Sequence, residues 1–207
     1  MKNKRFLFIF ALICITIFCI FYYIFLKFGN NNSKEKIVDE ILNSFNVYEA
    51  DVTVTVYSNK NTNNYNMHQI VNHKVSRCII NEPEEINGLN IELNDGKLLI
   101  KNEKYNMEKV YENYSEVLNN SLFLNTFSAD CINNGYKLKE SEENEVNNNE
   151  NKDEIIIETI LENNKNTYIK YKELYVDINN RIPKKLIIKD DKQNIYTSII
   201  YNNVKIK

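Results

Sequence analysis

The sequence reads ADVTVTVY from Ala50 to Tyr57. Apolar side chains alternate here with more polar ones, at the two-residue period of a strand that buries one face of a sheet. The buried set would be Ala50, Val52, Val54 and Val56. This stretch therefore predicts a half-buried β-strand, and the same period identifies further strands on either side of it.

Strand-like alternation recurs at residues 65–71, 75–80, 89–93 and 97–101, with one more short strand at Tyr105 and Met107. Asp95-Gly96 predicts a tight hairpin turn. After residue 154 the pattern predicts four further strands, the last from Ile195 to Ile206. The apolar face changes phase within Thr167–Ile178, which predicts a bulge or a sharp bend near Lys172 and Glu173. Roughly ten short strands at this spacing indicate a large antiparallel sheet.

Helical spacing of apolar residues appears ahead of the sheet and again in mid-chain. Ser33 can cap a helix whose apolar stripe runs from Ile37 to Phe45. In mid-chain, Val110–Leu118 and Ser121–Ile132 predict a helical insert that stops at Gly135. The predicted fold class is α+β, with a large curved antiparallel sheet wrapped over helices.

An uncharged stretch, Phe6–Leu26, precedes all of these elements. As a helix it would span roughly 30 Å, the thickness of a bilayer core, so a single N-terminal transmembrane signal anchor is predicted. No A-x-A-like cleavage site follows it, and no small residue precedes Cys14 or Cys19 as a lipoprotein signal would require. The basic residues before it predict a cytoplasmic N-terminus; they are Lys2, Lys4 and Arg5.

These observations divide the chain into segments. Residues 1–5 are predicted to be a cytoplasmic tail, 6–26 the membrane anchor, 27–36 a tether and 37–207 an extracytoplasmic domain. Within that domain residues 140–153, ESEENEVNNNENKD, are acidic and rich in Asn, which predicts a flexible loop. The expected location is the cell membrane, crossed once, with the C-terminal domain outside.

The charge of the chain narrows the class of partner. The 207 residues include 26 Lys and Arg against 28 Asp and Glu, and four of the bases but none of the acids precede Phe28. The rest of the chain is therefore net acidic. Nucleic acid and anionic membrane surfaces require a basic patch, so neither is an expected partner of the domain.

Candidate catalytic residues are few. His68 and His73 would face opposite sides of a continuous strand, so they do not form a pair of metal ligands. Cys131 would need a neighbouring base to act as a nucleophile, and it could instead pair with Cys78 in a disulfide. We therefore expect no enzymatic activity, no catalytic, cofactor or metal site and no cofactor, and the partner-binding residues stay unassigned.

Several motifs, in their order along the chain, carry a resemblance to a known family. They include Tyr57-Ser58-Asn59-Lys60, Asn94-Asp95-Gly96-Lys97, Arg181-Ile182-Pro183-Lys184-Lys185-Leu186 and Tyr201-Asn202-Asn203-Val204. In this order they resemble the GerS-type germination lipoproteins of spore-forming bacteria, distant relatives of the LolA/LolB lipoprotein carriers. The resemblance covers approximately Ile37 to Lys207, and the chain departs from the family in lacking a lipobox.

The resemblance implies a half-open barrel-like sheet with helices across its concave face. It also implies a non-catalytic, membrane-anchored protein of the forespore or spore envelope. Such proteins bind a cortex N-acetylmuramoyl-L-alanine amidase and enable it to begin making muramic-δ-lactam, the mark read during germination. The alternative is a LolA- or RseB-like carrier or envelope sensor that holds a lipid or lipoprotein in the concave face. A homodimer is compatible with either reading.

Overall fold

The computed structural model describes residues 34–112, 114, 121–140, 154–162 and 166–207. The chain divides into two compact units, Met1–Glu40 and Ile41–Lys207. A helix over residues 34–44 begins in the first unit and ends in the second. All strands lie in the second unit, which is the unit described below.

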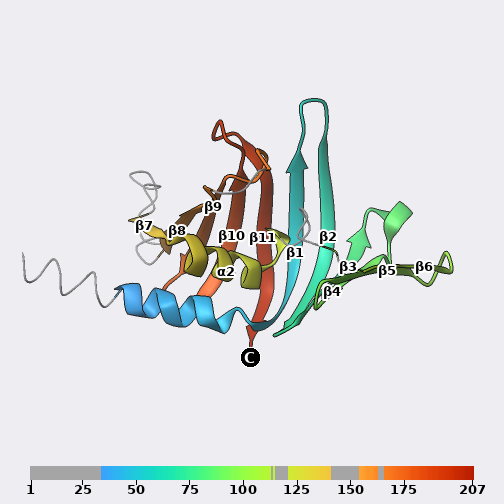
Figure 1. The fold of residues 1–207 in the computed structure, drawn as a ribbon, viewed down its shortest axis with the longest axis horizontal. Helices are drawn as coiled ribbons and strands as arrows, with labels where there is room; N and C mark the ends of the chain where they lie inside the picture. The colour runs from blue at the N-terminus through green and yellow to red at the C-terminus, as the bar shows by residue number, and fades with distance from the viewer. Residues whose placement is uncertain (1–33, 113, 115–120, 141–153, 163–165) are drawn as a thin grey trace, which may run out of the picture. The chain divides into compact units, whose positions relative to one another are not determined.

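The described strands form one eleven-stranded sheet in which all neighbours are antiparallel (Figure 1). Their order across the sheet is β6-β5-β4-β3-β2-β1-β11-β10-β9-β8-β7. The first strand and the last are therefore neighbours at its centre. The strands are β1 (Val47–Tyr57), β2 (Thr62–Asn72), β3 (Val75–Glu82), β4 (Asn90–Asn94), β5 (Lys97–Asn102), β6 (Met107–Tyr111), β7 (Lys137–Glu140), β8 (Glu154–Ile160), β9 (Tyr171–Asp177), β10 (Ile182–Lys189) and β11 (Ile195–Ile206).

The alternation predicted for β1 is confirmed except at Val56, which is half-buried. Ala50, Val52 and Val54 are at most 2 % exposed, whereas Asp51 and Thr53 lie on the other face and are half-buried. The hairpin between β4 and β5 turns at Asp95-Gly96, both of which have positive φ (47° and 76°). Two consecutive positive φ angles define the turn type whose twist matches that of antiparallel strands. We call the face that carries Val52 and Val54 the helix face, and the face that carries Asp51 and Thr53 the open face.

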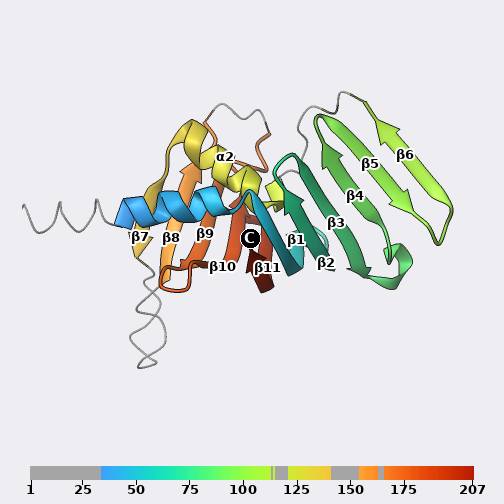
Figure 2. The ribbon, with the colours of Figure 1, turned by 90° about the horizontal axis from the view of Figure 1, so that it is seen from below.

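Helix α2 (Leu124–Asn134) lies across the helix face, over strands on the β7 to β11 side of the sheet (Figure 2). It buries Leu124, Phe127 and Cys131, and it ends at Gly135, whose φ of 79° suits a glycine. A short 3-10 helix, η1 (Glu84–Ile86), links β3 to β4. The side chains that fill the helix face, each at most 2 % exposed, include Phe45, Tyr48, Phe123, Phe127, Ile157, Leu174, Leu186 and Ile199.

Polar contacts inside this core fix where α2 begins. The Tyr48 hydroxyl donates to Gln69 Oε1 at 2.8 Å and accepts from the Leu124 backbone N–H at 3.1 Å. Gln69 Nε2 in turn donates to the Leu122 carbonyl at 3.2 Å. Both side chains are almost fully buried, so each contact satisfies a group that would otherwise be costly to bury. The first turn of α2 is thereby tied to β1 and β2.

An ion pair ties the other end of α2 to the sheet. Lys172 on β9 is 1 % exposed, and its Nζ lies 2.5 Å from Asp130 Oδ2 on α2. Thr159 on β8 also donates to the Gly135 carbonyl at 2.8 Å. A buried ammonium without a partner would cost several kcal/mol, so Asp130 has to stay close to Lys172 for the helix to remain docked.

The predicted fold class is wrong. The sequence predicts α+β, with a transmembrane helix ahead of a sheet wrapped over helices, whereas the described chain is one large antiparallel sheet with only two α-helices. Within the described ranges, no helix is long and apolar enough to cross a membrane. The predicted anchor Phe6–Leu26 itself lies outside the described residues, as do 141–153 of the acidic loop.

Two local predictions are met only in part. The predicted short strand at Tyr105 and Met107 is present as β6, but it runs through Val110 and Tyr111, whose spacing suggested a helix, because these residues pair with β5. Of the predicted bulge or sharp bend near Lys172 and Glu173, only a bend is found, at residues 169–170, and β8 and β9 pair without a shift. The change of phase arises because β9 begins only at Tyr171 and Ile169 is buried from the preceding bend.

Candidate functional site

The histidines are far from forming a catalytic group. His68 lies on the open face, where its Nδ1 is 2.7 Å from Asp51 Oδ1 and its Nε2 is 3.4 Å from Glu49 Oε1. His73 occupies the turn between β2 and β3 with a positive φ of 48°. His73 therefore lies outside the strand that carries His68. Among the described residues no group of three or more His, Cys, Asp or Glu could hold a metal ion.

The two cysteines of the described chain are free thiols in the core. Burial raises the pKa of Cys78 to about 12, and burial together with the nearby Asp130 carboxylate raises the pKa of Cys131 to about 12. A thiol at neutral pH with such a pKa is almost entirely protonated, so neither is a competent nucleophile. The disulfide left open by the sequence is not formed.

Beneath α2, the described side chains of the helix face are closely packed. Phe45, Phe123 and Phe127 fill the space between the helix and the central strands, and each is at most 2 % exposed. The hydroxyl and amide groups of Tyr48 and Gln69 bond to each other and to the start of α2. These side chains form a closely packed, internally bonded layer, as protein interiors usually do.

Strand β6 presents a different surface at one end of the sheet. Among the described strands it has a neighbour, β5, on one side only, and all five of its residues are exposed. Large apolar side chains gather on and beside it: Tyr105 (55 % exposed), Met107 (42 %), Val110 (49 %) and Tyr111 (39 %). Tyrosine and methionine are enriched at protein interfaces, and an unpaired strand edge can accept a strand from another chain.

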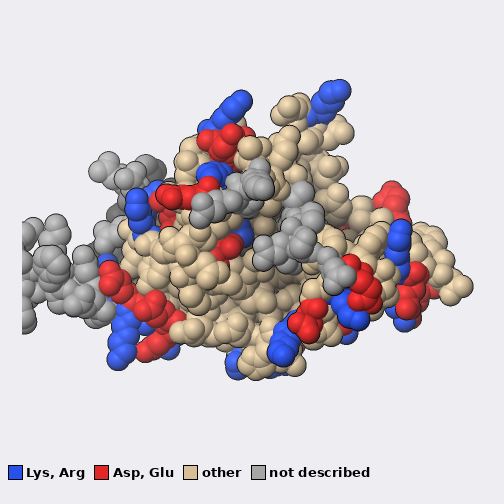
Figure 3. All heavy atoms as spheres, in the orientation of Figure 1, with Lys and Arg blue, Asp and Glu red and all other residues tan. Residues whose placement is uncertain are grey.

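Charge around this edge is mixed. Lys97 Nζ lies 2.9 Å from Glu112 Oε2, and Lys104 Nζ lies 3.1 Å from Glu84 Oε1. On the face shown in Figure 3, Lys and Arg are likewise interspersed with Asp and Glu among the described residues. Such a surface does not offer the single-sign patch that nucleic acid requires.

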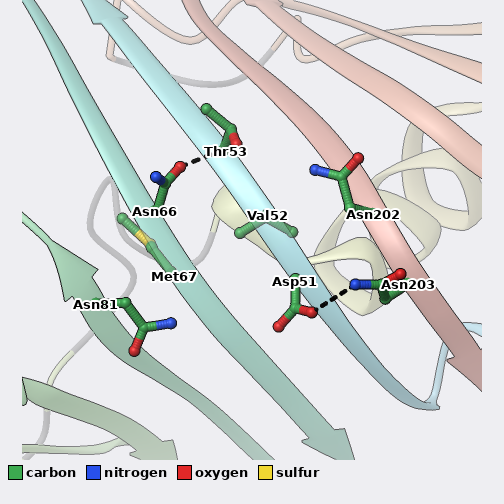
Figure 4. Close-up of a pocket in the computed structure, with 8 residues that line it drawn as sticks. All are labelled: Asp51, Val52, Thr53, Asn66, Met67, Asn81, Asn202 and Asn203. Atoms are coloured by element: carbon green, nitrogen blue, oxygen red, sulfur yellow. Dashed lines mark hydrogen bonds between the residues drawn. The ribbon is translucent and has the colours of Figure 1, made fainter.

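The open face is hollowed where β11, β1, β2 and β3 lie side by side (Figure 4). The hollow has a volume of about 280 Å³, and Val52 and Met67 contribute to its lining. Its polar side chains are Asp51, Thr53, Asn66, Asn81, Asn202 and Asn203. The Thr53 hydroxyl donates to Asn66 Oδ1 at 3.0 Å, and Asn203 Nδ2 donates to Asp51 Oδ2 at 3.0 Å.

Two irregularities in strand pairing bring asparagines to this hollow. Asn66 pairs with Glu82 and Met67 with Ile80, so Asn81 is an extra residue on β3. Glu49 pairs with Lys205 and Asp51 with Asn202, which leaves Asn203 and Val204 opposite Ala50. Asn203 has a φ of 51°, a conformation that asparagine tolerates better than most residues. Sequence analysis did not find this site, because the bulges appear only once the register of the strands is known.

Comparisons with known proteins bear on the fold and the family. A crystal structure of an uncharacterized conserved protein from Thermus thermophilus is similar to this chain, with 10% identity, a TM-score of 0.50 and coverage of 84% of this chain and 88% of that one. This likeness concerns the fold alone. The search of curated proteins finds no match.

Two further solved structures are similar to this chain at lower TM-scores. One contains the CwlD amidase from Clostridioides difficile in complex with the GerS lipoprotein (20% identity, TM-score 0.49, covering 87% of this chain and 95% of that chain). The other is a LolA superfamily protein from Nitrosomonas europaea (13% identity, TM-score 0.42, covering 85% of this chain and 93% of that chain).

The profile of the family described as "Sporulation protein YdcC-like" matches residues 4–207, nearly the whole chain. The resemblance to sporulation proteins is confirmed at the level of this family. The chain belongs to the YdcC-like sporulation protein family.

Proposed function

We propose that this chain is a non-catalytic binding protein of sporulation that engages a protein partner through the exposed edge of β6. The observation that carries the proposal is that edge, where four large apolar side chains are 39–55 % exposed on and beside a strand with one described neighbour. Membership of a sporulation protein family supports a role in sporulation. The resemblance to GerS-type proteins supports a cortex amidase as the partner and an extracytoplasmic location.

The side chains most able to do chemistry support a binding role. Cys131 is buried on α2 with a raised pKa, and Cys78 is buried on β3. His68 is engaged by two carboxylates, and no Ser, Thr or Cys nucleophile is bonded to it by a described contact. An activated nucleophile needs such a bond to its base.

The edge of β6 supports binding by strand addition. A strand added there would gain main-chain hydrogen bonds, and its side chains would cover Val110 on the open face or Met107 and Tyr111 on the other. Side chains of this size supply much of the energy of protein interfaces when they become fully buried. The β5–β6 hairpin would therefore gain both main-chain and apolar contacts from one partner.

The proposal can be tested by affinity capture with the full-length chain from sporulating cells that produce it. The variant Val110→Lys/Tyr111→Lys places two charges on the edge, and Ile132→Lys/Ile182→Lys is a control with equal added charge at apolar sites that are 69 % and 40 % exposed. We expect the wild type and the control to capture an amidase. The edge variant should capture at least about tenfold less of it, since charged edges oppose strand pairing.

Equal recovery of the amidase by the edge variant would exclude β6 as the binding surface. Recovery of a second copy of this chain in place of an amidase, with a doubled mass in light scattering, would replace the proposed partner by a homodimer.

A further inference from the structure

The hollow on the open face has free hydrogen-bonding groups on two sides. Within the described part of the chain, the side-chain amides of Asn81 and Asn202 have no hydrogen-bond partner, and both are exposed. Asn81 comes from β3 and Asn202 from β11, so they lie on either side of the β1–β2 pair (Figure 4). Between them, two hydrogen bonds hold the other polar side chains in place: Thr53 bonds to Asn66, and Asn203 bonds to Asp51.

The charges at the hollow exclude ionic ligands. No Lys or Arg lines it, and the Asp51 carboxylate would repel a phosphate or carboxylate ligand. Of the residues that line the hollow, only Asp51 is a carboxylate, with Oδ1 at 2.7 Å from His68 Nδ1 and Oδ2 bonded to Asn203, and the Glu82 carboxylate beside the hollow accepts from Asn66 Nδ2. Hard cations bind where several carboxylate or carbonyl oxygens converge, which is not the case here.

The lining favours a neutral ligand rich in hydroxyl groups. An asparagine amide offers two donors and an acceptor, and a hydroxyl group also both donates and accepts. Six polar side chains surround the space, so a purely apolar ligand would strip water from them without replacing its bonds. The volume of about 280 Å³ lies just below the usual range of ligand pockets, and the open shape lets a longer chain continue beyond it.

We propose that this hollow binds one unit of a neutral oligosaccharide, with Asn81 and Asn202 as the amides that reach its hydroxyl groups. An extended peptide fits less well, because β11, β1, β2 and β3 pair with one another at the hollow and leave no strand edge for a main-chain ladder. This site is separate from the β6 edge and does not depend on the amidase.

The test is a titration of the full-length chain, followed by calorimetry in a polyoxyethylene detergent that carries no sugar. The probes are tetra-N-acetylchitotetraose and cellotetraose, which differ in their acetamido groups, and tetra-alanine serves as the peptide. We expect saturable binding of at least one saccharide. The variant Asn81→Ala/Asn202→Ala should weaken it by at least about tenfold, through the loss of two or more hydrogen bonds.

The control variant is Asn63→Ala, which removes an exposed amide from β2 outside the hollow. It should bind as the wild type does. Because neither Asn81 nor Asn202 makes a described side-chain bond, their loss should leave the melting temperature unchanged, which separates a binding defect from unfolding. The proposal would be overturned if neither saccharide binds, if the double variant binds as well as the wild type, or if tetra-alanine binds in place of the saccharides. Each of these outcomes is independent of the result at β6.

Discussion

The centre of the sheet and its β6 end are built from the same antiparallel pairing, yet they bury very different amounts of side chain. In β1 every second residue from Tyr48 to Val54 is at most 2 % exposed, and α2 lies over the neighbouring strands. In β6 all five residues are exposed, and in β4 none is fully buried. The central strands therefore supply most of the stability, whereas the outer strands β4, β5 and β6 leave apolar surface available for binding.

The largest test of this difference places the same charge in both regions. Val54→Asp puts a carboxylate at a site with 0 % exposure, which should cost at least about 4 kcal/mol and unfold most of the protein. Val110→Asp, at 49 % exposure on β6, should cost less than about 1 kcal/mol. Urea denaturation of both variants gives the two values. Similar costs would show that the regions do not differ as described.

A second test compares ion pairs in the two regions. Asp130→Ala leaves the Lys172 ammonium buried without a partner and should cost about 3 kcal/mol, much of which Lys172→Met should restore in the double variant. Glu112→Ala removes the partner of Lys97 at the outer strands, where both side chains are 59 % exposed, and should cost under about 1 kcal/mol. Thermal melts of these variants and the wild type check this order. If the double variant is no more stable than Asp130→Ala, the unpaired charge of Lys172 does not cause the loss of stability.

These comparisons show which parts of the molecule the sequence could predict. The alternation from Ala50 to Val56 was enough to predict β1, because a strand that buries one face has apolar residues at every second position of its own sequence. The start of β6 was predicted as a short strand, but Val110 and Tyr111 were assigned to a helix, because their pairing with β5 is not visible in the local sequence. The Asp51–Asn203 contact joins residues 152 positions apart, and the Lys172–Asp130 pair joins residues 42 apart. Contacts of this kind depend on strand register, which local patterns do not contain.

The smallest expected effect is a dependence on pH at the open face. Hydrogen bonds from Asn203 and then His68 lower the pKa of Asp51 below the ordinary value for an aspartate. A carboxyl group whose pKa is lower in the folded than in the unfolded protein stabilises the fold at pH values above its unfolded pKa, about 4. This contribution is lost as the pH falls through the pKa of the folded state. Asp51→Asn should therefore be slightly less stable than the wild type at pH 7, and the gap should close below about pH 4. Urea denaturation at pH 7, 5 and 3 measures it, and a gap that stays constant would contradict the assignment.

The central claim is that the protein acts by binding at the β6 edge and not by its own chemistry. The most direct measurement is the muramic-δ-lactam content of cortex from spores that carry single variants of the full-length chain. His68→Gln and Cys131→Ala remove the best acid–base and thiol groups, and a true catalytic group typically contributes at least ~10²-fold in rate. We predict lactam near the wild-type level in both, and its loss in Val110→Lys/Tyr111→Lys with the folded protein present at normal abundance. Lactam that disappears in His68→Gln, while the edge variant retains it, would contradict the account.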